Sequence, residues 1–360
     1  MSLKIIGHRV IYKNPRYYCG PGPAVVVTPA GAIIVAFRRV PSWVAYGHYG
    51  HWHPATESCL THSEDGGATW SRPHVFLGGN QCPSLTRLRD GVLIHSTHRM
   101  ELVPEEIAAA CPDVRSVRRS PWPGVQAGTA ICRSEDNGRT WSDPVFLDGV
   151  PGLAPLHPNL HMPAAVRGNV LETAGGRLFI SAYTGNDPNS AYLFQSQDDG
   201  RSWTYQSRIA EGFNETTLYE TEKGDLVGFL RSWGGDYPRH LHRARSTDGG
   251  DTWSTPEPIC KGFPACALRL PNGRVLLAYG YRFDDGLGVR ARLLSPDCEV
   301  IDDKEELLIR SDGAVTDLGY PHAALLPDGR AFVVYYINRR TDAPDGSAPR
   351  YIEGCILEEA

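Results

Sequence analysis

Hydrophobic and polar residues along this chain form pairs of short hydrophobic segments, each pair joined by a tight turn. The first pair reads PAVVVTPAGAIIVAFRR and the last reads PHAALLPDGRAFVVYYINRR. The turns contain Gly together with Pro, Asp, Asn or another polar residue, a composition that favours chain reversal between strands. The pattern therefore predicts six units of two adjacent antiparallel strands, which start at Pro23, Pro83, Ala164, Thr216, Pro264 and Pro321.

A second pattern, Ser-x-Asp-x-Gly-x-Thr/Ser-Trp, occurs four times, starting at Ser63, Ser134, Ser196 and Ser246. Asp and Ser side chains can accept hydrogen bonds from nearby backbone N–H groups, and Gly tolerates a positive φ angle. The Trp is then placed to pack against the sheet, where its indole N–H can find an acceptor. The recurrence predicts a turn, rather than a catalytic role, for its aspartates: Asp65, Asp136, Asp198 and Asp248.

Six units in 360 residues leave 60 residues for each, enough for a four-stranded antiparallel sheet with one long loop. Sheets that are hydrophobic on both faces can cover one another when they are arranged radially. We therefore predict an all-β fold, a six-bladed β-propeller formed by one domain over residues 1–360. Strands at Ile5–Tyr12 and Tyr351–Leu357 are expected to pair and close the ring. The segment Glu101–Gln126 is expected to be a loop with a short helix near Glu105–Ala110.

Composition and charge exclude several classes of protein. A hydrophobic content of 41% with 21% charged residues is typical of a folded globular protein. No apolar run approaches the ~18 residues of a membrane helix, and a net charge of −5 gives nucleic acid no general attraction. The sequence therefore predicts neither a membrane nor a nucleic-acid partner.

Cysteine usage and cofactor motifs add three expectations. The nine cysteines have no regular spacing, which favours buried free thiols over disulfides. The first residues lack the apolar stretch and cleavage site of a signal peptide, so we expect a cytoplasmic location, although a removed signal sequence would leave the same chain. Nucleotide, haem and flavin motifs are missing from the sequence, which predicts that no cofactor is required.

The Ser-x-Asp pattern is similar to the aspartate box of the bacterial-neuraminidase repeat, and with six two-strand units the chain resembles the sialidase superfamily. This resemblance implies a carbohydrate substrate, expected to be anionic. Sialidases use a Tyr nucleophile activated by a Glu, an exception to the two-carboxylate mechanism of most glycosidases. An anionic nucleophile would be repelled by the carboxylate on the anomeric carbon of the sugar. In the family three arginines bind that carboxylate, and an Asp on a mobile loop is the acid/base.

Two units carry the family's catalytic pattern. In the fourth unit, Asn214-Glu215 is followed by Arg231 and then by the box STDGGDTW. In the sixth, Tyr320 stands eight residues before Asp328 of an Asp-Gly turn. The resemblance thus implies that Tyr320 is the nucleophile, that Glu215 is its base, and that Arg231 binds the substrate carboxylate. A free Tyr titrates near pH 10, so it needs such a base at neutral pH.

Further substrate-binding candidates follow with less direct matches. Arg38 and Arg39 end the second strand of the first unit, where sialidases place an Arg that contacts ring hydroxyls. The third carboxylate-binding Arg belongs in the fifth unit, where Arg282 and Arg290 both lie near the expected position. Residues that crowd the axis of a propeller add two more candidates, Asp317 and His322.

The chain departs from the family pattern in the first unit. It reads Gly20-Pro21-Gly22-Pro23 where sialidases have Phe/Tyr-Arg-Ile-Pro, so the first carboxylate-binding Arg is missing. No Asp lies between Arg39 and Asp65, where the acid/base is expected. Because His transfers protons near neutral pH, we hypothesise that one of three histidines replaces that Asp. The candidates are His48, His51 and His53.

Two other interpretations of this histidine segment stay open. It could be a surface loop whose aromatic residues cap the propeller. Its three histidines could also bind a metal ion, but with no nearby carboxylate we predict no metal site.

Three functions from two classes remain open on the sequence. The leading hypothesis is a sialidase-like exo-glycoside hydrolase acting on a terminal acidic sugar. A polysaccharide lyase acting on uronate-containing glycans is the second, since it needs cations and a Tyr or His base. The third is a carbohydrate-binding propeller without turnover, for which the trio Glu215, Arg231 and Tyr320 would be unnecessary. The sequence predicts neither the sugar nor the oligomeric state.

Overall fold

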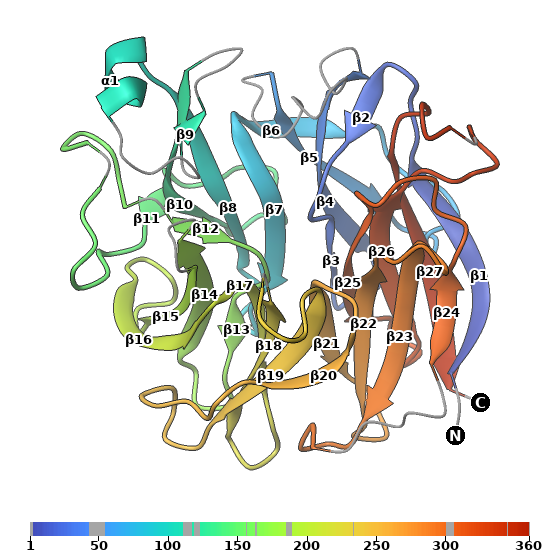
Figure 1. Cartoon of the computed structure of the whole chain (residues 1–360). Helices are drawn as coiled ribbons and strands as arrows, with labels where there is room; N and C mark the ends of the chain where they lie inside the picture. Colours follow the sequence, from blue (N-terminus) through green and yellow to red (C-terminus); the bar gives the residue numbers. More distant parts are fainter. Residues whose placement is uncertain are drawn as a thin grey trace.

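Six antiparallel sheets, the blades, are arranged around one axis in this computed structural model (Figure 1). The structure describes residues 3–42, 55–110, 117–118, 123–155, 157–162, 164–184, 189–232, 234–299, 306–343 and 345–359. In these residues the secondary structure consists of β-strands and one short helix, α1 (Glu105–Ala110). The predicted all-β, six-bladed propeller with four-stranded antiparallel blades is confirmed.

Each blade runs from an inner strand at the axis to an outer strand at the rim. Blade 1 contains β2 (Tyr17–Cys19), β3 (Ala24–Val27), β4 (Ile33–Pro41), β5 (Glu57–Ser63) and β6 (His74–Gly78). Blade 2 contains β7 (Asn80–Arg87), β8 (Leu93–Leu102), β9 (Val117–Arg118), β10 (Gly124–Ser134) and β11 (Val145–Phe146). Blade 3 contains β12 (Ala164–Val166), β13 (Leu171–Glu172), β14 (Leu178–Thr184), β15 (Ser190–Ser196) and β16 (Thr204–Glu211).

The remaining blades have four strands each. Blade 4 contains β17 (Phe213–Glu220), β18 (Leu226–Ser232), β19 (His240–Ser246) and β20 (Glu257–Lys261). Blade 5 contains β21 (Ala265–Arg269), β22 (Val275–Tyr281), β23 (Gly288–Leu294) and β24 (Leu307–Arg310). Blade 6 contains β25 (Gly319–Leu325), β26 (Ala331–Ile337), β27 (Tyr351–Glu359) and, from the other end of the chain, β1 (Leu3–Tyr12).

The ring closes through the two ends of the chain. Strand β1 pairs antiparallel with β27, with Leu3 opposite Glu359 and Val10 opposite Glu353. The two termini consequently lie side by side in Figure 1. This confirms the predicted closing pair, which joins blade 6 to the start of the chain.

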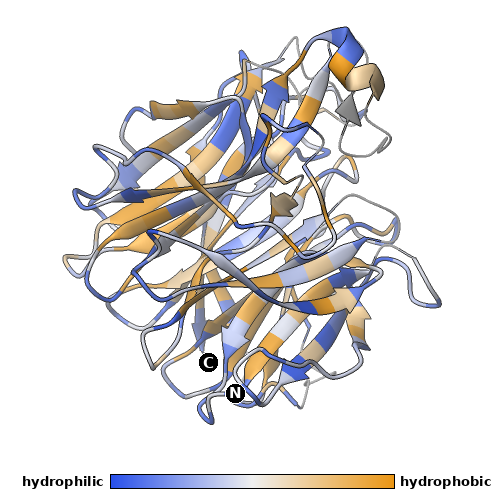
Figure 2. Cartoon of the chain, turned by 90° about the vertical axis from the view of Figure 1, so that its left-hand side faces the viewer, coloured by the Kyte–Doolittle hydropathy of each residue, from blue (hydrophilic) through white to orange (hydrophobic). Residues whose placement is uncertain are grey.

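The hydrophobic core lies between neighbouring blades. Because most blades are covered on both faces, their central strands are buried along their whole length, as in β22 and β26. Hydrophobic segments therefore follow the strands, while hydrophilic segments concentrate in the connecting turns (Figure 2). Eight cysteines in the described segments are free and buried, as predicted, namely Cys19, Cys59, Cys82, Cys132, Cys260, Cys266, Cys298 and Cys355.

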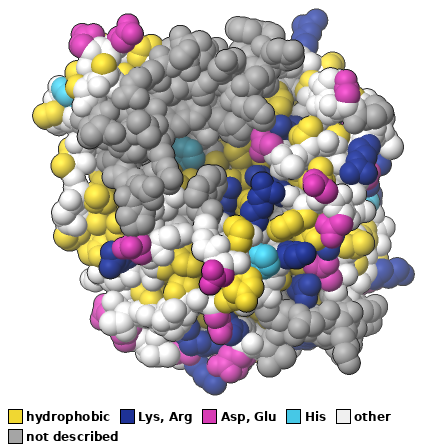
Figure 3. All heavy atoms as spheres, viewed as in Figure 1, with side chains coloured by type: hydrophobic (Ala, Val, Ile, Leu, Met, Phe, Trp, Pro, Cys, Tyr) yellow, Lys and Arg dark blue, Asp and Glu magenta, His cyan; other side chains and the backbone are white. Residues whose placement is uncertain are grey.

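The described part of the surface is mixed in charge. On the face seen in Figure 3, Lys and Arg side chains are interspersed with Asp and Glu side chains. Among the residues described, no helix has the length and hydropathy needed to span a membrane.

The four Ser-x-Asp patterns form turns at the rim, between the third and fourth strands of blades 1 to 4. In the first, the Ser63 hydroxyl donates to Asp65 Oδ1 at 2.7 Å and accepts the Gly67 N–H at 2.8 Å. The hydroxyl and N–H of Thr69 also donate to Asp65, which holds the pKa of that carboxyl below its ordinary value. The same bonds recur around Asp136, Asp198 and Asp248, which confirms their predicted turn role.

In blades 2 to 4, the glycine at the fifth position of the turn is required by a close approach to the preceding blade. A Cβ at Gly138 would lie 2.5 Å from Leu60 Cδ1, and a Cβ at Gly250 would lie 2.5 Å from Leu193 Cδ2. At Gly200 the corresponding distance to Ile94 Cδ1 is 2.9 Å. Each of these turns thus packs its backbone directly onto a hydrophobic side chain of the neighbouring blade.

Blade 5 has the same turn without the sequence pattern. The Ser295 hydroxyl donates to Asp297 Oδ1 at 2.5 Å and accepts the Glu299 N–H at 3.1 Å. Cys298 has a φ of 59°, close to the 57° of Asn137 at the same position in blade 2. The pattern search missed this turn because Gly and Trp are absent from it.

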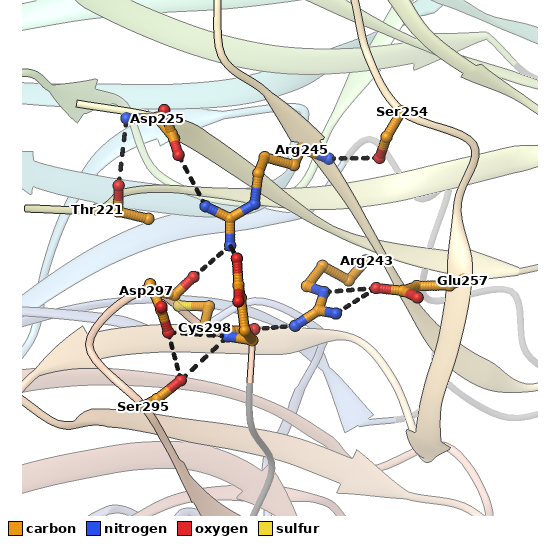
Figure 4. A network of polar contacts seen from close by, with 10 residues as sticks. Thr221, Asp225, Arg243, Arg245, Ser254, Glu257, Ser295, Asp297 and Cys298 are labelled. Carbon is orange, nitrogen blue, oxygen red and sulfur yellow. Dashed lines mark hydrogen bonds and ion pairs between the residues drawn. The ribbon is translucent and has the colours of Figure 1, made fainter. Parts of the chain in front are cut away.

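Two arginines of blade 4 hold the blade 5 turn in place (Figure 4). Arg245 donates to the backbone carbonyl of Asp297 and to Asp225 Oδ2, the latter at 2.9 Å. Arg243 donates to the carbonyl of Cys298 and to Glu257 Oε1. These charged hydrogen bonds join blades 4 and 5 where the other turns use glycine and tryptophan.

The segment Glu101–Gln126 was predicted to be a loop, and this is wrong at both ends. Strands β8 and β10 extend into it, so that Glu101 pairs with Val125 and Leu102 pairs with Gly124. The helix expected near Glu105–Ala110 is confirmed as α1.

Candidate active site

Tyr320 and Glu215 lie at irregularities near the starts of two inner strands. The register shifts between Gly319 and His322 in β25, and between Phe213 and Thr216 in β17. Tyr320 has a φ of 49°, a left-handed conformation that is uncommon for a residue with a side chain. Such bulges redirect side chains next to active sites.

A glycine contact allows this backbone conformation. Gly319 has a φ of 93°, and a Cβ on it would lie 2.8 Å from the Cα of Gly280 in blade 5. Only glycine fits both the angle and the close approach. The contact therefore fixes the position at which Tyr320 leaves the strand.

Tyr320, Glu215 and Arg231 form one hydrogen-bonded group. The Tyr320 hydroxyl donates to Glu215 Oε1 at 2.5 Å. Arg231 Nη1 donates to Glu215 Oε2 at 2.5 Å and to the Tyr320 hydroxyl at 3.1 Å. Tyr320 is 6% exposed and Glu215 is 5% exposed, so these contacts form largely away from bulk water.

The surroundings set the protonation of the pair. Burial alone would raise the pKa of Glu215, but the charge of Arg231 and the Tyr320 hydrogen bond outweigh it, and the pKa falls below its ordinary value. Burial, together with the Glu215 charge, raises the pKa of Tyr320 well above its ordinary value. At neutral pH the pair is therefore a phenol and a carboxylate, which is the form needed for base-assisted attack by Tyr320.

Arg282 lies against the Tyr320 ring. Its guanidinium carbon is 5.0 Å from the ring centre, and its Nε and Nη2 donate to the Leu318 carbonyl at 3.0 and 2.8 Å. Asp317 Oδ1 lies 3.7 Å from Arg282 Nη2. Asp317 also accepts hydrogen bonds from three further residues, Tyr18, Tyr336 and Arg350. Asp317 is thus placed to orient Arg282.

Arg38 is fully buried beside Gly20. Its Nη2 donates to Thr56 Oγ1 at 3.2 Å. A Cβ at Gly20 would lie 1.9 Å from Arg38 Nη1, so the guanidinium occupies the space next to the residue that precedes Pro21. Burial lowers the pKa of Arg38 to about 10, which still leaves it protonated at neutral pH. A cation from β4 is therefore present near the first-blade position where the sequence lacks an Arg.

Three of the candidate binding residues lie apart from the hydrogen-bonded group. Arg39 points to the other face of β4, where its Nε donates to Glu57 Oε2 at 2.7 Å. Arg290 stacks on the ring of Tyr281 and pairs with Glu306. His322 is buried further along β25, where it accepts the Val25 N–H at 3.0 Å, and burial lowers its pKa to about 3. His48, His51 and His53 lie outside the described residues.

Sequence reasoning missed three residues near the pair, namely Arg167, Cys82 and Tyr183. The Arg167 guanidinium carbon lies 5.0 Å from the centre of the Tyr320 ring. Cys82-Pro83 of blade 2 corresponds to Tyr320-Pro321 of blade 6, with φ angles of 51° and 49° and a register shift at each. Aligning the units with one another would have revealed this correspondence. Burial and the charge of Glu215 raise the pKa of Tyr183 well above its ordinary value.

Comparisons with known proteins agree with this fold. The family model for the BNR repeat-like domain matches residues 116–334. A solved protein of unknown function from Dyadobacter fermentans is 32% identical, with 100% of both chains covered and a TM-score of 0.86. A search of curated proteins gave no match.

Two solved sialidase structures are similar at lower identity. The intramolecular trans-sialidase from Ruminococcus gnavus, in complex with oseltamivir carboxylate, is 15% identical, with 98% of both chains covered and a TM-score of 0.67. The NanB sialidase from Streptococcus pneumoniae is 14% identical, with 99% of this chain and 71% of that chain covered and a TM-score of 0.62.

The chain thus has the sialidase-like propeller fold that these solved structures share. By the family-model match it belongs to the BNR repeat-like family.

Proposed function

We propose that this protein is a sialidase-like exo-glycoside hydrolase that acts on a terminal acidic sugar. The observation that carries the proposal is the buried 2.5 Å hydrogen bond from the Tyr320 hydroxyl to Glu215 Oε1, next to Arg231. A carbohydrate-binding propeller would have no need for a phenol paired with a base in this way. Sialidases among the similar solved structures support the same class of activity.

In the proposed reaction, the Tyr320 oxygen attacks the anomeric carbon while its proton passes to Glu215 Oε1. The bond from that carbon to the leaving oxygen breaks, and an acid protonates the leaving group. Water then attacks the glycosyl-tyrosine and gives its proton to the group that had protonated the leaving oxygen, which restores that acid. Glu215 returns its proton to the Tyr320 oxygen as the product leaves. Arg231 holds the Glu215 carboxylate and the Tyr320 oxygen in line throughout, since it bonds to both.

The charges around Tyr320 favour an anionic sugar. Among the described residues, five guanidinium groups gather here with two carboxylates, Glu215 and Asp317. The guanidinium groups belong to Arg38, Arg167, Arg231, Arg282 and Arg350. Guanidinium groups pair with carboxylates in a two-pronged geometry, so we assign binding of the sugar carboxylate to Arg231 and Arg282.

The proton donor to the leaving group is assigned to one of His48, His51 and His53, which follow β4 in the sequence. Imidazole can supply a proton near neutral pH without a large pKa shift. Each His→Ala variant is to be tested for turnover, and one of them should lose about a hundredfold. Unchanged rates in all three would remove this assignment.

Release of the fluorophore from an aryl sialoside tests the proposal. Tyr320→Phe should reduce turnover by roughly a thousandfold or more, because it removes the nucleophilic oxygen and little else. Tyr335→Phe is the matched control, since the Tyr335 hydroxyl bonds to His8 and Glu353 in blade 6, away from Glu215. Wild-type turnover that Tyr320→Phe leaves intact would contradict the mechanism.

A uronate-containing polymer distinguishes the remaining functions. Absorbance in the near ultraviolet would reveal the unsaturated product of a lyase. Cleavage without that absorbance would keep the hydrolase assignment with a different acidic sugar. Binding without cleavage of either substrate would favour a carbohydrate-binding propeller.

A further inference from the structure

A cavity lies on the propeller axis, further along the inner strands than the Tyr320–Glu215 pair. Its volume is ≈ 370 Å³, and the inner region of every blade contributes to its wall. One lining residue from each blade illustrates this, namely Val25, Leu85, Arg167, Thr217, Cys266 and His322. Tyr320 and Glu215 belong to the first residues of β25 and β17, whereas the lining residues lie further along these strands. The cavity therefore opens toward the opposite end of the axis from the proposed catalytic pair.

The wall of this cavity is apolar with a cationic part. Most of its side chains are Val, Leu and Ala, and among the described lining residues the charged ones are two arginines, Arg87 and Arg167, with no Asp or Glu. Ligand pockets for small molecules share this volume range and combine apolar walls with a few polar groups. The charge of the wall favours an anion.

Arg167 is the buried cation of this wall. It is 2% exposed, and its Nη2 donates to the Pro321 carbonyl at 3.1 Å. Its Nε has no hydrogen-bond partner, and no carboxylate among the described residues forms an ion pair with it. The Glu215 charge acts on Arg167 only from beyond ion-pair distance. A buried guanidinium with no direct ion pair is costly, so an anion in the adjoining cavity would offset part of that cost.

Asn169 adds a second donor beside Arg167. His322 Nδ1 accepts the Val25 N–H, so the proton of the neutral imidazole must be on Nε2. His322 Nε2 faces the Asn169 amide, and an N–H there can only donate to the amide oxygen. The Asn169 amide is therefore oriented with its oxygen toward His322. Its NH₂ group then lies on the opposite side, where the other orientation would leave the amide oxygen buried without a partner. The unsatisfied groups at this wall, which also include Arg87 Nε, are then all N–H donors.

We propose that this axial cavity binds a small organic carboxylate. The carboxylate group would accept hydrogen bonds from Arg167 and Asn169, and its apolar part would contact the Val, Leu and Ala side chains of the inner strands. The site is separate from the Tyr320–Glu215 pair and does not depend on the proposed glycosidase activity. Arg167 contacts both regions, since its guanidinium also lies against the Tyr320 ring.

Fluorine NMR with 4,4,4-trifluorobutyrate tests this site in the full-length protein. The expected result is saturable broadening of the probe signal, with little effect on the neutral analogue 4,4,4-trifluorobutan-1-ol. Arg167→Gln should weaken binding about tenfold or more, because a hydrogen bond to a charged group is lost. Asn169→Leu is the second variant, since it removes the donor and keeps a similar side-chain volume in case Arg167→Gln does not fold.

Arg231→Gln separates this cavity from the arginines around Tyr320. Binding that survives Arg231→Gln and weakens in Arg167→Gln or Asn169→Leu supports the proposal. Binding that is lost in Arg231→Gln and unchanged in the other two would place the probe at Tyr320 and overturn it. Undetectable binding of the probe would overturn it as well. Equal affinity for chloride, or for the neutral alcohol, would overturn the assignment to an organic carboxylate.

Discussion

The rim turns and the axial pair both depend on hydrogen-bonded carboxylates, but they are assembled in opposite ways. Asp65 at the rim is exposed, and Ser63 and Thr69, which bond to it, lie within four residues along the chain. Glu215 at the axis is buried, and its partners Arg231 and Tyr320 are 16 and 105 residues away. One carboxylate completes a local turn, and the other joins two blades.

The difference explains why similar chemistry has different consequences. Hydrogen bonds from Thr140 and neighbouring groups lower the pKa of Asp136 to about 2, and these partners all belong to its own turn. Glu215 gains its low pKa in a buried place, where the Arg231 charge counters desolvation and the Tyr320 proton is within reach. A local sequence pattern thus marks a structural carboxylate, and a long-range contact creates the one that we propose as a base.

Replacing the carboxylate by an amide, at Glu215 on the axis and at Asp136 on the rim, tests the difference between these two carboxylates and has the largest expected effect. Glu215→Gln should reduce kcat/KM for the aryl sialoside by roughly a thousandfold, because the base is lost while the side-chain shape is kept. Asp136→Asn is the matched rim variant and should change kcat/KM by no more than about twofold. Similar losses in both variants, with both proteins folded by circular dichroism, would contradict the contrast.

The pH dependence of the proposed reaction tests whether Glu215 is the buried base. Glu215 must be ionised to accept the Tyr320 proton, so kcat/KM should fall about tenfold per pH unit below the Glu215 pKa. Because that pKa is lowered, the acid limb should lie below the ordinary Glu value of about 4.3. The stability contributed by Glu215 is likewise present above about pH 4.3 and lost as pH falls through its lowered pKa.

Removing the Arg231 charge is the corresponding control for the pH profile. Without that charge, burial raises the pKa of Glu215. Arg231→Met should therefore move the acid limb of the profile to higher pH. An unchanged limb in this variant would mean that another group controls the profile.

The difference between local patterns and long-range contacts also explains how much of the site the sequence alone could predict. Motif offsets placed Tyr320, Glu215 and Arg231 because each stands at a fixed distance from an Asp-Gly turn or a rim pattern. The choice between Arg38 and Arg39 depends on which face of β4 turns inward, and a bulge or a shifted register can reverse it. Arg167 follows the inner strand β12 with no motif of its own, so only the folded ring brings it to Tyr320.

The fifth rim turn shows the converse limit of a pattern search. Ser295 and Asp297 keep the geometry of the other turns, while the residues that made those turns recognisable are replaced. In the other turns, the glycine allows a close approach to the neighbouring blade and the tryptophan packs against the sheet. Variants at the glycine test the close approach, and variants at the serine test the hydrogen bonds that all five turns share.

Gly138 and Gly66 form a matched pair for the close approach. Both have a positive φ, 85° and 71°, so Ala strains the backbone at either position. A Cβ at Gly138 would collide with Leu60 of the preceding blade, whereas nothing lies within 4 Å of one at Gly66. Gly66→Ala should therefore cost about 1 kcal/mol of unfolding free energy, and Gly138→Ala about 1–3 kcal/mol more. Equal losses in denaturant unfolding would show that backbone strain alone makes glycine necessary.

Ser295→Ala in blade 5, compared with Ser246→Ala in blade 4, tests the turn without its pattern. Each serine donates to an Asp two residues on and accepts an N–H four residues on. Each variant should lower the free energy of unfolding by about 1 kcal/mol, the usual net value of a lost side-chain hydrogen bond. Similar losses would show that the hydrogen-bond geometry defines the rim turn, whichever residues accompany it. A loss at Ser246 with none at Ser295 would mean that Arg243 and Arg245 hold the fifth turn by themselves, because their bonds to the Cys298 and Asp297 carbonyls do not involve the serine.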